Sequence, residues 1–136
     1  MAERGLGESP WVTAAIWAVA IGCTALTLGF SLGPAPPGEF ASDRELHAIA
    51  YFVNTLAILL AAVWRPGRRA GRPDRWALLI AAGMAILGGV VEVLQTGVGR
   101  DAQLPDWVAD VIGIALAVVV FVTFRRAFGA RVARSS

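Results

Sequence analysis

The chain has 136 residues, of which 57% are hydrophobic and only 16% are charged, with 12 basic and 10 acidic side chains. A mean hydropathy of +0.64 is too high for an ordinary soluble domain of this length. The composition therefore argues against a soluble globular protein and predicts an integral membrane protein.

Four apolar stretches are each long enough to cross a bilayer as a helix, which takes about 20 mostly apolar residues. These stretches lie at about 10–32, 46–64, 76–96 and 106–124. They are continuous runs rich in Ala, Leu, Val and Ile, without the alternating polarity of membrane barrel strands. We therefore expect an all-α membrane bundle of four transmembrane helices in a single domain, 1–136, with short tails at 1–9 and 126–136.

The first stretch, 10–32, contains no charged residue, and the segment GPAPPG at 33–38 ends the helix because proline interrupts its hydrogen bonding. A cleaved signal peptide is the competing interpretation. The apolar core is longer than in such peptides, and a single Arg precedes it, so we expect a retained span. Cys23 is the only cysteine, and no intramolecular disulfide can form.

Polar residues recur on one face at the start of the second stretch. Asp43, His47 and Tyr51 are spaced i, i+4, i+8, and Arg44 precedes His47 by three residues. In a helix this spacing places an imidazole and a phenol on one face near a charged entrance. A lone histidine near a helix end is often structural, but apolar surroundings make such a group costly and favour a functional role.

Arginines are concentrated around the loop between the second and third stretches and after the fourth. They are Arg65, Arg68, Arg69, Arg72, Arg75, Arg125, Arg126, Arg131 and Arg134. Short basic loops beside membrane spans follow the positive-inside rule, so no nucleic-acid ligand is needed to explain them. We expect a multi-pass protein of the inner (plasma) membrane, with both termini and loop 65–75 cytoplasmic. Loops 33–45 and 97–105 are then extracytoplasmic.

The third and fourth stretches carry acidic residues near the same predicted outer surface. Glu92 and Gln95 share a helix face, and Asp106 and Asp110 begin a stripe that continues with small residues at i+7 and i+11. Asp106 at a helix start can complement the helix dipole. Asp110 lies one turn deeper, where that explanation is weaker.

The predicted topology brings all these polar side chains to one depth of the outer leaflet. The set comprises Asp43, Arg44, His47, Tyr51, Glu92, Gln95, Arg100, Asp106 and Asp110. Two interpretations stay open at this point. The residues form either a polar pocket or a set of buried ion pairs that only fixes the packing of the helices.

Three motifs of the chain match a known pattern in order and spacing. They are DRELHAIAYF at 43–52, EVLQ at 92–95 and RDAQLPDWVADVIG at 100–113. With them the chain resembles the VanZ-like family of small membrane proteins, whose patterns are D-K-x-x-H-x-x-x-Y and R-x5-D-x3-N-x2-G, with Asp110 where Asn is common. The resemblance covers about 10 to 125 and implies a link to the cell envelope and to low-level resistance to the glycopeptide teicoplanin.

We expect the outer-leaflet pocket to bind or process an anionic cell-envelope lipid, precursor or glycopeptide-related ligand. Arg44 and Arg100 would pair with its phosphate or carboxylate groups. If a reaction occurs, His47 and Glu92 are the candidate general acid and base. The other expected ligand-binding residues are Asp43, Tyr51, Gln95, Asp106 and Asp110.

The sequence leaves alternatives to this function. Two acids within the spans also suit a proton- or ion-coupled carrier, for which a homodimer is one arrangement, although the sequence shows no inverted repeat. A non-catalytic subunit of an envelope complex is a further alternative. No metal or other cofactor is expected, because one histidine with carboxylates beside two arginines is a poor metal-binding pattern.

Overall fold

A computed structural model describes residues 9–33, 43–63, 73–97 and 103–132. These residues form four helices: α1 (Pro10–Leu32), α2 (Asp43–Val63), α3 (Pro73–Gly97) and α4 (Leu104–Val132). Each helix contains an apolar window long enough to cross a membrane, and the described ranges contain no strand. The prediction of an all-α bundle with four membrane-spanning helices is confirmed.

The helix bounds follow from local sequence, but three of the four helices are longer than predicted. α1 has the predicted bounds: it starts at Pro10, a favoured first position, and ends where the Gly33 amide donates to the Gly29 carbonyl at 2.9 Å. α2 and α3 each begin three residues earlier than expected, and α4 continues to Val132 rather than 124. The apolar runs correspond to the part of each helix that can cross the hydrocarbon core. The three longer helices continue beyond that part into the polar flanking sequence.

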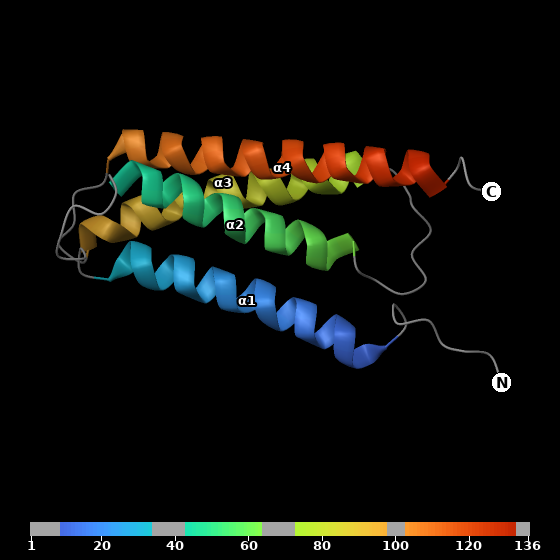
Figure 1. Cartoon of the computed structure of the whole chain (residues 1–136). Helices are drawn as coiled ribbons and strands as arrows, with labels where there is room; N and C mark the ends of the chain where they lie inside the picture. Colours follow the sequence, from blue (N-terminus) through green and yellow to red (C-terminus); the bar gives the residue numbers. More distant parts are fainter. Residues whose placement is uncertain (1–8, 34–42, 64–72, 98–102, 133–136) are drawn as a thin grey trace.

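α2 lies at the centre of the bundle. It packs most extensively against α4 and also contacts α1 and α3, as Figure 1 shows. Gly113 of α4 makes this close packing feasible, because a Cβ there would overlap the Ala48 carbonyl oxygen and lie 3.1 Å from the Phe52 amide nitrogen. The predicted stripe of Asp106, Asp110, Gly113 and Ala117 is buried along its whole length.

The interior changes from apolar to polar along the bundle. Two apolar clusters fill it, one around Tyr51, Met84 and Ile114, the other around Leu59, Ala77 and Phe121. Large apolar side chains also cover the outside, including Phe30, Leu78, Ile86 and Phe124. Exposed apolar surface of this extent suits contact with lipid rather than with water.

Buried polar side chains gather at the end of the bundle where α1 and α3 finish and α2 and α4 begin. We call this end the polar end (Figure 1). The opposite end carries the described arginines Arg75, Arg125 and Arg126. It also carries Trp11 and Trp76, which are exposed as expected for interfacial side chains. Trp64 lies outside the described residues.

Candidate functional site

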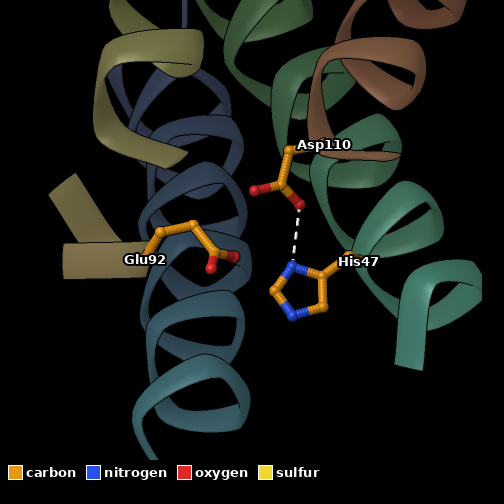
Figure 2. Close-up of side chains that lie close together, drawn as sticks. All are labelled: His47, Glu92 and Asp110. Carbon is orange, nitrogen blue, oxygen red and sulfur yellow. Dashed lines mark hydrogen bonds and ion pairs between the residues drawn. The ribbon is translucent and has the colours of Figure 1, made fainter. Parts of the chain in front are cut away.

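Three ionisable side chains from three different helices meet inside the polar end. They are His47 on α2, Glu92 on α3 and Asp110 on α4, with exposed fractions of 6%, 6% and 0%. Figure 2 shows these side chains reaching toward one another. Each supplies one potential ligand atom, and the three atoms all lie within 4.8 Å of one another. We call these residues the buried triad.

The triad is held partly by its own contacts and partly by the loop before α4. His47 Nδ1 lies 2.9 Å from Asp110 Oδ1, in a buried hydrogen bond (Figure 2). Glu92 Oε2 accepts a hydrogen bond of 3.0 Å from the Gln103 backbone amide. These contacts use one oxygen of each carboxylate. The second oxygen of each, Glu92 Oε1 and Asp110 Oδ2, takes no part in them.

Several buried oxygens at the triad have no hydrogen-bond partner among the described residues. They are Glu92 Oε1, Asp110 Oδ2 and the Tyr51 hydroxyl oxygen. A buried polar atom without a partner costs about 1–3 kcal/mol, and more if it is charged. The site therefore has the capacity to accept hydrogen bonds from a ligand or to coordinate a cation.

Gly88 on α3 allows these groups to approach each other. A Cβ at this position would lie 2.9 Å from Asp110 Oδ2, 3.4 Å from Tyr51 Cε1 and 3.5 Å from Trp107 Cδ1. The absence of a side chain at Gly88 thus leaves room for the unpaired carboxylate oxygen.

Arg44 and Asp106 form the rim of the site, one turn nearer the helix ends. Arg44 Nε lies 3.8 Å from Asp106 Oδ1, and the arginine side chain is 61% exposed while that of Asp106 is 5% exposed. A pair this open to its surroundings contributes little to stability. Arg100 and the side chain of Asp43 lie outside the described residues. Of the other seven expected residues, six gather around the triad and the rim, and the seventh is Gln95.

Gln95 is buried but faces α1 rather than the triad. Its Nε2 donates a 2.8 Å hydrogen bond to the Ser31 carbonyl. This contact connects the ends of α1 and α3 at the polar end. Gln95 therefore has a structural contact where the sequence suggested ligand binding, and the Ser31 carbonyl was not expected at the site.

Two further polar contacts were not predicted from the sequence. Asn54 is fully buried, and its Oδ1 accepts a 2.9 Å hydrogen bond from the Thr24 hydroxyl of α1. Asn54 follows His47 by seven residues, so helical spacing was the signal that would have placed it on the same face. Trp107 on α4 donates a 3.0 Å hydrogen bond from Nε1 to the Ala85 carbonyl of α3.

The fold and site define a multi-pass membrane protein of four helices with an acidic, partly unsatisfied cluster at one end. No protein-family model, curated protein or solved structure matches the chain. The resemblance to VanZ-like proteins therefore stays a prediction from the sequence.

Proposed function

We propose that the polar end binds the headgroup of an anionic membrane lipid or lipid-linked envelope precursor. The observation that carries this proposal is the buried triad with its unpaired oxygens, one helical turn deeper than the rim pair of Arg44 and Asp106. An anionic group of the ligand would contact Arg44, since a guanidinium offers forked donors to phosphate or carboxylate. The inner part of the headgroup would face the triad.

The depth of the triad supports a headgroup ligand. His47 is the fifth residue of α2 and Asp110 the seventh of α4. At about 1.5 Å per residue, both lie roughly 6–9 Å from their helix ends. The headgroup layer is about 5–8 Å thick on each side of a hydrocarbon core of about 30 Å. If these helix ends lie at the outer edge of the headgroup layer, the triad is near the boundary between headgroups and acyl chains, well short of the midplane.

Charge distribution supports an outward-facing polar end. The described arginines Arg75, Arg125 and Arg126 lie at the opposite end, which the positive-inside rule would assign to the cytoplasm. The polar end would then face the cell envelope. The resemblance of residues 43–52 and 100–113 to VanZ-like motifs agrees with a ligand from the envelope, including glycopeptide-related ones.

A processing activity is the enzymatic form of this proposal. Asp110 holds one ring nitrogen of His47 at 2.9 Å, an arrangement that orients an imidazole for proton transfer. Glu92, with one unpaired oxygen in the same cluster, is the second candidate acid or base. Either residue would move a proton from or to a hydroxyl of the bound headgroup.

Native mass spectrometry of protein extracted gently from its own membrane tests the binding proposal. We expect a lipid or lipid-linked species on the wild type that is lost or reduced in Arg44→Gln and His47→Ala. Arg75→Gln, the same type of change at the opposite end, is the matched control and should keep the species. Equal lipid on all four proteins would contradict a specific site at the polar end.

A proton- or ion-coupled carrier is the second candidate, because two carboxylates and an imidazole are buried together in a membrane bundle. Flux in proteoliposomes separates the two functions. Substrate-dependent flux that disappears in Glu92→Gln would favour the carrier. Bound lipid without any flux would favour the headgroup site.

A further inference from the structure

We infer that His47, Glu92 and Asp110 form a binding site for a divalent transition-metal cation of the Zn²⁺ or Mn²⁺ class. One imidazole and two carboxylates converge from three helices at the polar end. The sequence pattern argued against a metal, because two arginines were expected inside the same pocket. In the structure Arg44 is at the exposed rim, and Arg100 lies outside the described residues, among which the triad consists of two carboxylates and one imidazole.

The distances within the triad fit coordination of one ion. Zn²⁺ bonds to imidazole nitrogen and carboxylate oxygen are about 2.0–2.2 Å long, so neighbouring ligand atoms lie roughly 3–4.4 Å apart. His47 Nδ1 and Asp110 Oδ1 are 2.9 Å apart, and the whole set lies within 4.8 Å. Rotation of the side chains within the cluster would bring all three atoms around one ion. The ion would replace the hydrogen bond between His47 and Asp110.

The unpaired oxygens are an independent indication of a ligand. Glu92 Oε1 and Asp110 Oδ2 belong to side chains that are more than nine-tenths buried, and neither has a partner among the described residues. Figure 2 shows the two carboxylates directed into the space that they share with the His47 ring. A purely structural network would be expected to satisfy these atoms within the protein.

Charge balance favours a divalent ion over a monovalent one. Two ionised carboxylates with a neutral imidazole carry a net charge of −2, and an isolated charge in apolar surroundings is strongly disfavoured. A divalent cation brings the cluster to neutrality. The mixture of one nitrogen and two carboxylate ligands suits Zn²⁺ or Mn²⁺ better than Mg²⁺ or Ca²⁺, which prefer oxygen ligands alone.

The shell around the triad is already arranged to hold its ligands. The Gln103 amide donates to Glu92 Oε2 at 3.0 Å and so limits the rotation of that carboxylate. Gly88 leaves space beside Asp110 Oδ2 that any larger residue would fill. Such outer contacts commonly change metal affinity by about 10–100-fold.

A bound cation would also explain how an acidic cluster could contribute to binding an anionic ligand. With three protein ligands, the remaining positions on the ion are open to a phosphate oxygen of the headgroup, next to Arg44. This second step rests on the proposed headgroup function. Binding of the ion itself does not.

The direct test is titration of the full-length protein in detergent with Mn²⁺, followed by electron paramagnetic resonance, and with Zn²⁺, followed by calorimetry. We expect one ion per chain, and an affinity at least about tenfold lower in Glu92→Gln, Asp110→Asn and His47→Ala. The matched control for Glu92→Gln is Glu45→Gln, the same change at an exposed carboxylate on α2. Glu92→Gln keeps the shape of the side chain and remains informative if His47→Ala fails to fold.

Two results would overturn the metal site: no ion bound by the wild type, or equal affinity in the wild type and the triad variants. A second experiment separates this inference from the headgroup proposal, using binding to phosphatidylglycerol vesicles with and without a chelator. Ion binding without any lipid preference would refute the headgroup function but retain the metal site. Specific lipid binding that a chelator leaves unchanged would overturn the role given to the ion.

Discussion

The contact between α2 and α4 at Gly113 gives the most direct test of the packing that forms the site. In Gly113→Ala, the new Cβ would overlap the Ala48 carbonyl oxygen and lie 3.1 Å from the Phe52 amide nitrogen. Both neighbours are backbone atoms of α2, so no side-chain rotation can relieve the overlap. The two helices must separate, and the His47 to Asp110 hydrogen bond joins the same two helices.

The size of the effect follows from two opposing contributions. Overpacking costs up to about 3 kcal/mol, whereas replacing glycine with alanine inside a helix gains about 1 kcal/mol. We therefore expect Gly113→Ala to lower the free energy of unfolding by about 2 kcal/mol. Gly83→Ala on α3 is the control, because its Cβ would meet nothing within 4 Å. This control should be neutral or slightly stabilising.

Unfolding in mixed detergent micelles, followed by circular dichroism, measures both variants. We expect the free energies of unfolding of the two variants to differ clearly, with Gly113→Ala the less stable. Equal stability of Gly113→Ala and Gly83→Ala would refute the close approach of α2 to α4 at this position. It would also remove the geometric basis for the buried triad.

Three further substitutions test other contacts of the polar end. Gly88→Ala places a Cβ 2.9 Å from Asp110 Oδ2, so metal affinity in calorimetry should fall by about tenfold or more; unchanged affinity would argue against coordination by Asp110. Trp107→Phe removes the hydrogen bond to the Ala85 carbonyl and should lower the free energy of unfolding by about 1 kcal/mol. Gln95→Leu removes the amide that reaches α1, and the same unfolding assay should show a loss of about 1–2 kcal/mol. A wild-type result for either of the last two would show that its hydrogen bond adds nothing.

The fold could be predicted from the sequence because the apolar runs are long and continuous. A bilayer requires each span to satisfy its own backbone hydrogen bonds, so length and hydropathy alone specify a helix. The helix ends were harder to predict from the sequence. Nothing in the apolar pattern shows that α4 continues through Arg125 and Arg126 to Val132, because a helix outside the hydrocarbon needs no apolar sequence.

The site was predictable as a location but not in its chemistry. Helical spacing and the order of the spans were sufficient to bring His47, Glu92 and Asp110 to one end. The exposed position of Arg44 depends on how a long side chain packs at the rim, which spacing does not determine. The carbonyl that Gln95 contacts is a backbone atom, and backbone atoms carry no signature in the sequence.

The most direct test of a ligand site in the buried triad is the unfolding temperature of wild type and Glu92→Gln, measured with and without Zn²⁺. A ligand that binds only the folded state stabilises it, by about 2.7 kcal/mol at a concentration of 100 times Kd. We expect Zn²⁺ to raise the unfolding temperature of the wild type but not of the variant. Without Zn²⁺, the variant should be at least as stable as the wild type, because an unpaired buried oxygen has been neutralised. A variant that is much less stable without Zn²⁺, in a protein that Zn²⁺ does not stabilise, would show that the triad only holds the helices together.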